Sequence, residues 1–166
     1  LCSDATVSDA GDVVGDPTEA ALVVLAAKLG VDAEESRREY PRLAEVPFDS
    51  EYKFMATFHR IEVDGASRVI ALVKGGPDVV LARCSEAGGP LSGSRAPLAG
   101  SRSEIEAANA RMGGKGLRVL AFAARFVEED ELATLASDPM ALTTGLGFVG
   151  LVGIIDPLRP SSKDAV

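Results

Sequence analysis

The stretch that decides the fold is FMATFHRIEV (residues 54–63), followed by Asp64-Gly65 and SRVIALV (residues 67–73). Both segments are rich in β-branched and aromatic residues, which favour strands. An Asp-Gly pair between two such segments is typical of a tight hairpin turn. The stretch therefore predicts two adjacent antiparallel strands at the centre of a sheet.

Further strands and helices are predicted on both sides of this hairpin. Asp16 can cap a helix that ends at Gly30, with Pro17 at its first position. The order of elements predicts an α/β domain with a twisted, mainly antiparallel β-sheet flanked by helices and helical hairpins. The predicted helices are 16–30, 33–40, 77–84, 102–112 and part of 128–142; the strands are 42–47, 54–63, 67–73, 118–126 and 147–156; and 86–100 is a loop.

Length and composition limit the classes of protein to consider. A chain of 166 residues can bury the core of one domain. Its net charge of −8 argues against nucleic acid and anionic membranes as partners, because both attract basic surfaces. The most apolar stretch, 145–155, is shorter than the about 20 residues of a membrane span. We expect a soluble fragment of a larger protein that does not itself insert in a membrane.

Four short segments carry the candidate chemistry. They are GDPTE (15–19), FDSEYKFM (48–55), KGGPD (74–78) and GLR (116–118). Together they supply an aromatic face, lysines, a carboxylate and an arginine. An aromatic ring can stack on a base, a carboxylate can accept a hydrogen bond from an exocyclic amine, and cations meet phosphate charge. These are the groups that a shallow site for a purine nucleotide triphosphate needs.

The first two segments also have purely structural interpretations. Glu19 fits the third position of a capping box that begins at Asp16. Phe48 can be a core aromatic at the end of a strand, and Met55 can pack beneath a pocket. Lys53 favours the ligand interpretation of its segment, because a lysine there can lie against the bound base or its phosphates.

The last two segments are open to similar alternatives. Lys74 ends an apolar strand and can be simply a solvated lysine, whereas the glycine that follows it, Gly75, would let a ligand approach the backbone. The glycines of 113–116 do not have the spacing of a phosphate-binding loop, and they follow a helix rather than a strand. Arg118 remains a candidate for a phosphate contact.

No catalytic or metal-binding set can be assembled from the sequence. His59 is the only histidine, and the cysteines Cys2 and Cys84 have no spacing typical of zinc ligands or of a disulfide framework. No Ser-His-Asp, Cys-His or paired-carboxylate arrangement can be argued from these residues. We therefore predict a binding site with no catalytic residue and no metal ligand.

The four segments, in this order, resemble the nucleotide-binding (N) domain of P-type cation-transporting ATPases, closest to the calcium- and sodium-pump branch. CSDA (2–5) is similar to the C-N-D-A opening of that family, and residues 15–22 to G-D-P-T-E-x-A-L. Residues 74–78 are similar to K-G-A-P-E and 116–121 to G-L-R-V-L-A. Residues 151–159 are similar to G-x-x-D-P-P-R, where the chain returns to the phosphorylation domain. The resemblance thus covers nearly the whole chain.

The resemblance implies roles for individual residues. Phe48 stacks on adenine, Glu19 contacts its amino group, and Arg118 reaches a phosphate. Asp156 and Arg159 belong to a hinge toward the phosphorylation domain, so the nucleotide-binding domain is 1–155 and the return segment starts within 156–166. The other residues that the resemblance places in the site are Ser50, Lys53, Met55, Lys74 and Gly75.

Besides Ser3 in CSDA, four positions depart from the pattern of the family. Gly76 replaces the alanine of K-G-A-P-E, and Asp78 replaces its glutamate. Ser50 stands where some calcium pumps carry an arginine, so one phosphate contact would be missing. Leu158 replaces the second proline of D-P-P-R, which would loosen the hinge.

The function implied is that of an ATP-binding domain on the cytoplasmic face of a membrane-embedded, ATP-driven cation translocase and hydrolase. It would present the terminal phosphate of ATP, as Mg-ATP in the parent protein, to an acceptor aspartate in the phosphorylation domain, alongside an actuator domain of the same chain. The D-K-T-G-T segment with that aspartate is absent from these residues. We therefore expect this chain to bind ATP weakly and not to hydrolyse it. Calcium is the transported ion that the resemblance favours.

Three alternatives lead to other functions. A protein-interaction module without nucleotide binding would use the same segments only as caps and turns. The nucleotide domain of a heavy-metal pump would need a His-Pro pair, but His59 is followed by Arg60. A phosphatase of the haloacid dehalogenase type would need a D-x-D-x-T-like segment, and the chain has none.

Overall fold

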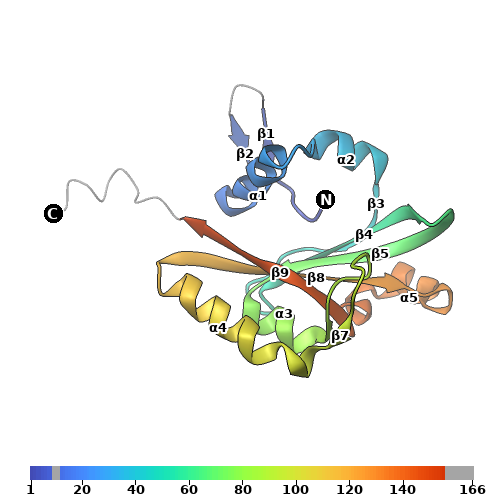
Figure 1. Ribbon diagram of the computed structural model, residues 1–166. Coiled ribbons are helices and arrows are strands. Elements are labelled where there is room, and N and C mark those ends of the chain that lie inside the picture. The colour runs from blue at the N-terminus through green and yellow to red at the C-terminus, as the bar shows by residue number, and fades with distance from the viewer. Residues whose placement is uncertain (9–11, 156–166) are drawn as a thin grey trace.

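A single sheet, built outward from the predicted hairpin, organises the molecule. A computed structural model describes residues 1–8 and 12–155 of the chain (Figure 1). Within them, seven strands form a sheet in the order β3-β4-β5-β8-β9-β6-β7. Neighbouring strands are antiparallel except for the parallel pair β6 and β9. The bounds are Arg42–Val46 for β3, Phe54–Val63 for β4, Ala66–Gly75 for β5, Cys84–Ala87 for β6, Ala96–Pro97 for β7, Leu117–Val127 for β8 and Leu146–Ile155 for β9.

Strands β4 and β5 form the predicted hairpin. They pair without a register shift from Phe54, opposite Gly75, to the turn. The turn residues Asp64 and Gly65 have φ values of 52° and 77°. Both φ values lie in the left-handed region, as a two-residue turn of type I′ requires. Asp and Gly are among the residues that adopt this region most readily. The local sequence thus determines where β4 ends and β5 begins.

Helices cover both faces of the sheet, which confirms the predicted fold class (Figure 1). Helices α1 and α2 lie over one face, together with the small sheet of β1 and β2, and α3 and α4 lie over the other. The bounds are Pro17–Lys28 for α1, Ala33–Glu39 for α2, Pro77–Arg83 for α3, Arg102–Gly113 for α4, Leu132–Ser137 for α5, Thr6–Val7 for β1 and Val13–Val14 for β2; three short 3-10 helices are η1 (Leu98–Gly100), η2 (Glu129–Glu131) and η3 (Pro139–Leu142).

The main hydrophobic core lies on the face covered by α3. Because successive residues of a strand point to opposite faces, Phe54 and Phe58 of β4 share one face with Val73 of β5. All three are buried and pack with Val80 of α3. The guanidinium of Arg83 lies 4.2 Å from the centre of the Phe54 ring, so the α3 side of the core ends in a cation–π contact.

The opposite face of β4 and β5 carries polar and ionisable side chains. Met55 lies opposite Lys74, and Thr57 lies opposite Leu72. Met55, Thr57, Lys74 and the next residue of this face, His59, are all buried. Buried polar groups need hydrogen-bond partners, and the partners of Lys74 define the site described below.

The segment 86–100 differs from its prediction as a loop. It contains the end of β6, the short strand β7 and the 3-10 helix η1. Its Gly, Pro and Ser content gives no strand signal, and β6 is a strand because it pairs with β9, which is distant in the sequence. Residue 156, the predicted last residue of the final strand, lies outside the described residues.

Candidate functional site

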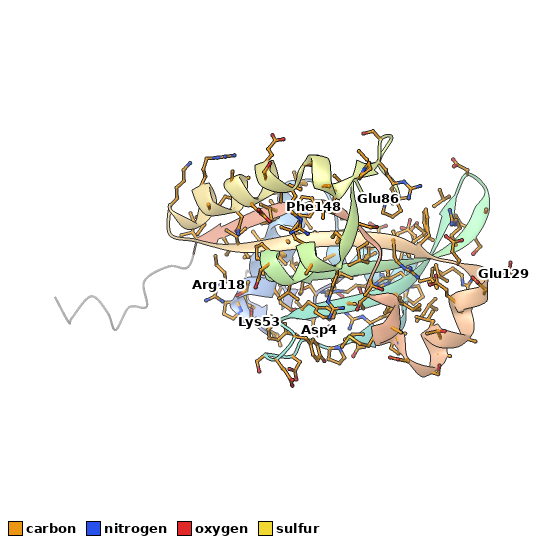
Figure 2. All side chains as sticks on the ribbon, turned by 90° about the horizontal axis from the view of Figure 1, so that it is seen from below. Asp4, Lys53, Glu86, Arg118, Glu129 and Phe148 are labelled. Carbon is orange, nitrogen blue, oxygen red and sulfur yellow. The ribbon has the colours of Figure 1, made fainter. Side chains whose placement is uncertain are left out.

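The predicted site residues gather at one end of the sheet. There β4 begins, β5 ends and β8 begins, because Phe54 pairs with Gly75 and Gly75 pairs with Ala121. Helix α1 begins at the same end, where the guanidinium of Arg118 donates to the hydroxyl of Thr18 over 3.0 Å. Figure 2 shows Arg118 near this end of the sheet and Glu129 at the opposite end.

Glu19 and Lys74 form a buried ion pair at this end. The ammonium of Lys74 donates to Oε1 of Glu19, and only 7% and 16% of the two side chains are exposed. Oε2 of Glu19 accepts the backbone N–H groups of Asp4, over 2.7 Å, and of Ala5, over 3.1 Å. The interpretation of Lys74 as a solvated lysine is therefore wrong. Its burial is possible because the carboxylate beside it compensates the charge.

The cap of α1 forms as predicted, but the side chain of Glu19 takes no part in it. Oδ1 of Asp16 accepts the N–H groups of Thr18, over 2.8 Å, and of Glu19, over 3.3 Å. Slight burial raises the pKa of Asp16, but these hydrogen bonds outweigh it and hold the pKa below its ordinary value. The side chain of Glu19 turns to Asp4 and Ala5 instead of returning to the cap. The capping-box interpretation of Glu19 is therefore wrong, because its carboxylate binds the backbone of Asp4 and Ala5.

Phe48 lies on the surface and is not a core aromatic. It precedes the turn between β3 and β4, and 61% of it is exposed. The turn is held by Asp49, whose side chain accepts the N–H of Glu51 over 2.7 Å and whose carbonyl accepts the N–H of Lys53, also over 2.7 Å. Ser50 is exposed in the same turn. The turn thus holds an exposed aromatic ring beside the end of the sheet.

Lys53 is joined to the end of β5 through its backbone. Its carbonyl accepts the N–H of Gly76 over 3.1 Å, and its φ of 54° turns the chain into β4. A Cβ added to Gly75 would lie only 2.5 Å from that carbonyl oxygen. Gly75 is therefore required by the close approach of β4 and β5, which is a packing reason for this glycine. Met55 is 1% exposed opposite Lys74 and packs in the interior, as its structural interpretation held.

Sequence reasoning missed several partners of the site. Thr18 contacts Arg118 from a position 100 residues away in the chain. The backbone N–H groups of Asp4 and Ala5, which bind Glu19, carry no side-chain signal at all. The thiol of Cys2 donates to the carbonyl of Met55 over 3.8 Å, and burial raises its pKa. Only the tertiary structure brings these groups together.

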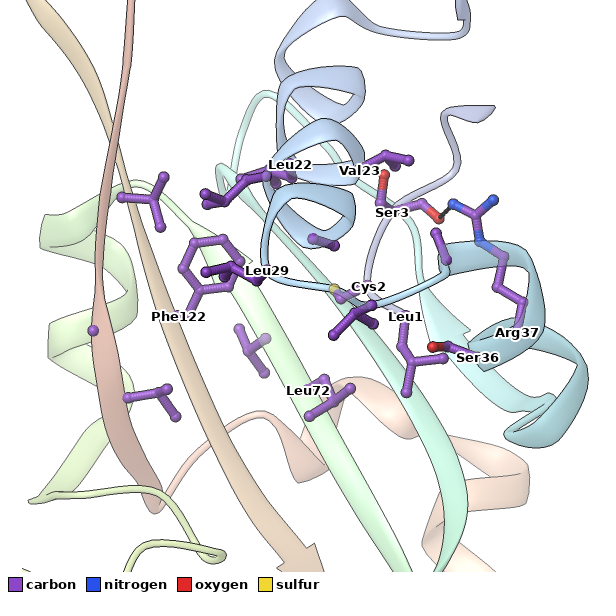
Figure 3. Close-up of a pocket in the computed structure, with 18 of the residues that line it drawn as sticks. Leu1, Cys2, Ser3, Leu22, Val23, Leu29, Ser36, Arg37, Leu72 and Phe122 are labelled. Atoms are coloured by element: carbon purple, nitrogen blue, oxygen red, sulfur yellow. Dashed lines mark hydrogen bonds between the residues drawn. The ribbon is translucent and has the colours of Figure 1, made fainter. Parts of the chain in front are cut away.

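An apolar cavity of about 560 Å³ adjoins the site between α1, α2 and the sheet. Figure 3 shows Leu22 and Leu29 facing Leu72 and Phe122 across it. Phe122 lies opposite Lys74 on the neighbouring strand, so the cavity begins next to the ion pair. Phe48, Lys53 and Arg118 do not line it. The predicted site is therefore an open surface at the end of the sheet, beside this cavity.

Two features are absent from the part of the chain that the structure describes, a metal-ligand cluster and a membrane-spanning helix. In residues 1–8 and 12–155, no set of three or more His, Cys, Asp and Glu side chains is arranged to hold a metal ion. No helix in the same residues is both long and apolar enough to cross a membrane. The predicted hinge residues Asp156 and Arg159 lie outside the described residues.

Comparison with known proteins identifies the family. The family model described as P-type ATPase, cytoplasmic domain N, matches residues 1–161. The chain is 42% identical over 169 residues to the cation-transporting ATPase pma1 of Synechocystis, with all of this chain and 18% of that protein covered. It is 36% identical over 167 residues to calcium-transporting ATPase 1 of Lactococcus lactis, again with 100% and 18% covered.

A human relative gives the same result. The chain is 37% identical over 171 residues to the human calcium-transporting ATPase type 2C member 1, with all of this chain and 16% of that protein covered. The chain thus spans less than a fifth of the length of each of these relatives. The resemblance drawn from the four sequence segments is confirmed, as is the cytoplasmic placement that the family description states. The chain belongs to the family of cytoplasmic N domains of P-type ATPases.

Proposed function

We propose that this chain binds ATP and presents its terminal phosphate to an acceptor aspartate in a separate phosphorylation domain of the same protein. Residues 1–155 form the nucleotide-binding domain in this proposal, and 156–166 begin the return to the phosphorylation domain. The observation that carries it is that the buried pair of Glu19 and Lys74 and the exposed ring of Phe48 belong to the same end of the sheet, where β5 ends and β4 begins. A polar pair and an exposed aromatic ring at one end of the sheet suit a ligand that is both flat and polar, such as a purine base.

The hydrogen bonds of Glu19 support recognition of adenine. A carboxylate has about four acceptor positions, and Asp4, Ala5 and Lys74 use three of them. The remaining position lies on Oε1, beside the ammonium of Lys74. Adenine presents an amine donor next to a ring-nitrogen acceptor, so the amine would donate to Glu19 and the ring nitrogen would accept from Lys74. At the position of this amine, hypoxanthine and guanine carry a carbonyl oxygen, an acceptor that cannot donate a hydrogen bond to Glu19.

Phe48 supplies the stacking surface. A large aromatic ring that is 61% exposed leaves apolar area in water, which a stacked base would cover. Base–aromatic stacking contributes about 1–3 kcal/mol per base. Stacking on Phe48 is thus expected to provide much of the affinity of a site as open as this one.

Lys53 and Arg118 would meet the phosphates. Both are exposed cations at the end of the sheet where the ion pair lies. The bond from Arg118 to Thr18 fixes the guanidinium against the first turn of α1. Ser50, which replaces a possible further cation, would leave part of the triphosphate in water. A triphosphate that stays partly in water suits a domain that presents the terminal phosphate to a second domain. We expect weak binding, and a dissociation constant of about 1 mM would correspond to a binding free energy of about −4 kcal/mol.

The proposal for the whole protein is a membrane-embedded, ATP-driven cation translocase. Phosphoryl transfer depends on positioning and on charge stabilisation by a metal. This chain would supply the positioning, while the acceptor aspartate, the residues for Mg-ATP and the actuator domain would be supplied by other parts of the parent protein. The names of the relatives point to a cation, and to calcium in two of the three.

The test is an NMR titration of the isotopically labelled chain with ATP and with adenosine. Both ligands should give saturable shifts clustered at Glu19, Phe48, Lys53, Lys74 and Arg118. Phe48→Ala should weaken the binding of both ligands by about fivefold or more, because the base loses its stacking contact. Leu91→Ala is the matched control, because Leu91 is 62% exposed on a distant loop.

Diffuse, unsaturable shifts from a folded chain would contradict ATP binding. The protein-interaction module would then be the better interpretation of the same surface. Saturable binding that Phe48→Ala leaves unchanged would retain a nucleotide site but remove Phe48 from it.

A further inference from the structure

Residues 2–5, named here the strap, run between α1, α2 and β4 without forming a helix or strand. Ala5 is fully buried at the end of the strap. A Cβ added to Gly15 would lie 3.0 Å from the Cα of Ala5, so the residue before the cap of α1 packs directly against it. Ser3 and Ala5 are thus buried, although Asp4 between them is exposed and the strap has no regular structure.

One side of the strap holds Glu19. The N–H groups of Asp4 and Ala5 point to the same carboxylate oxygen, over 2.7 and 3.1 Å. Two donors converging on one oxygen restrict the rotation of the carboxylate about its terminal bond. The other oxygen is thereby directed at Lys74.

The other side of the strap is held by Arg37 of α2. Its Nη2 donates to the carbonyl of Ser3 over 3.0 Å and to that of Ala5 over 2.7 Å. Figure 3 shows the guanidinium reaching from α2 to Ser3. Its Nη1 pairs with Glu34 one turn earlier on the helix. Both terminal nitrogens of the Arg37 guanidinium are therefore held by partners, Nη2 by the strap and Nη1 by Glu34.

We propose that Arg37 is a positioning residue for base recognition, acting through the strap on the carboxylate of Glu19. The inference rests on the proposed binding of ATP. A cation at a carbonyl oxygen polarises the peptide unit and strengthens the N–H groups of the same chain segment. The order of charges is the guanidinium of Arg37, the peptide units of the strap, the carboxylate of Glu19 and the ammonium of Lys74. Removing the first member releases the strap, and Glu19 loses the fixed direction of its remaining acceptor position.

This role differs from a general contribution to stability. Arg37 touches neither Lys53 nor Arg118 in any hydrogen bond or ion pair among the described residues, so contacts with phosphates do not depend on it. Only the distinction between an amine and a carbonyl on the base depends on the direction of Glu19. The ratio of affinities for ATP and inosine triphosphate reports that distinction alone, because both nucleotides carry the same triphosphate.

The experiment compares Arg37→Met with Arg38→Met by titration with ATP and inosine triphosphate. Arg38 is the matched control, since it is exposed on the same helix and forms no hydrogen bond or ion pair among the described residues. Arg37→Met is expected to lower the ratio of the affinities for ATP and inosine triphosphate by about fivefold, because the site loses the equivalent of one hydrogen bond to adenine. Arg38→Met should keep the preference of the original chain. Arg37→Lys should give a smaller loss, since an ammonium lacks the planar fork of a guanidinium.

Thermal unfolding and backbone NMR spectra show whether each variant is folded. If Arg37→Met does not fold, Arg37→Lys decides the question by the same ratio. A preference for ATP that survives in every folded Arg37 variant overturns the role of Arg37 and leaves ATP binding intact. If the original chain binds both nucleotides equally, then recognition of the base by Glu19 and the role of Arg37 are both wrong. If it binds neither nucleotide, the proposed function is wrong as well.

Discussion

Lys74 is a lysine that the fold has almost removed from water, with 6% of it exposed. A charge so placed destabilises the folded state unless an opposite charge lies against it. Glu19 provides that charge and is itself held by two backbone N–H groups. The pair therefore contributes to the stability of the domain and, in the proposed function, to the recognition of the base.

Breaking this pair tests its structural part. Lys74→Met leaves Glu19 buried without its cation, and we expect it to lower the free energy of unfolding by about 3 kcal/mol, as for buried ion pairs. Chemical denaturation measures the change. Lys28→Met, at the exposed end of α1, should change the free energy by less than about 0.5 kcal/mol. Equal small effects of both substitutions would show that the pair adds nothing to stability.

Helix α1 shows how an element carries a site residue. The cap by Asp16 and the proline at the first position determine where the helix begins. The start of the helix determines the direction of Glu19 in its first turn, and that of Thr18, which meets Arg118. These features of α1 could be predicted from residues 15–19, because capping acts over a single turn. The partners of Glu19 and Thr18 could not, because they come from other elements.

The cap can be tested at the same scale. Asp16→Ala removes the acceptor for the N–H groups of Thr18 and Glu19, and we expect a loss of about 1 kcal/mol in the free energy of unfolding. The loss should shrink at low pH, because the lowered pKa of Asp16 means that its stabilising effect is present above the ordinary pKa and disappears as the carboxylate is protonated. Denaturation at pH 7 and below pH 3 measures both effects. A loss that is the same at the two pH values would contradict the role of the carboxylate.

At the scale of the whole molecule, the two faces of the sheet differ in chemistry. The α3 face is a hydrophobic core, whereas the α1 face buries His59, Thr57 and Lys74. Nδ1 of His59 lies 2.8 Å from the carbonyl of Tyr40, and burial lowers the pKa of the ring although this contact opposes it. The folded domain thus favours a neutral His59, whose Nδ1–H donates to Tyr40.

This burial predicts a pH dependence of stability. Because the pKa of His59 is lower in the folded than in the unfolded chain, the unfolded chain takes up the proton first as the pH falls below about 6.5. The free energy of unfolding should therefore fall between about pH 7 and pH 5, by at most about 1.4 kcal/mol per pH unit. His59 is the only histidine in the chain, so His59→Gln should flatten this dependence. Urea denaturation across this range measures it, and an unchanged slope in the variant would contradict the assignment.

The sequence by itself determined what depends on neighbours along the chain. The Asp64-Gly65 turn, the cap at Asp16 and the periods of the strands were all predictable, because turns, caps and alternation act over a few residues. The four segments also sufficed to predict the family, since each keeps its residue types in order. The role of the site residues in binding a nucleotide remains a prediction.

Only the tertiary structure decided which of these residues are buried and what they touch. Lys74 is buried and Phe48 is exposed, the reverse of what each structural interpretation assumed. The strap, Arg37 and the parallel pairing of β6 with β9 were also beyond the sequence. The physical reason is the same in each case. Burial and backbone hydrogen bonds between distant segments depend on how elements pack, and backbone groups leave no mark in the order of side chains.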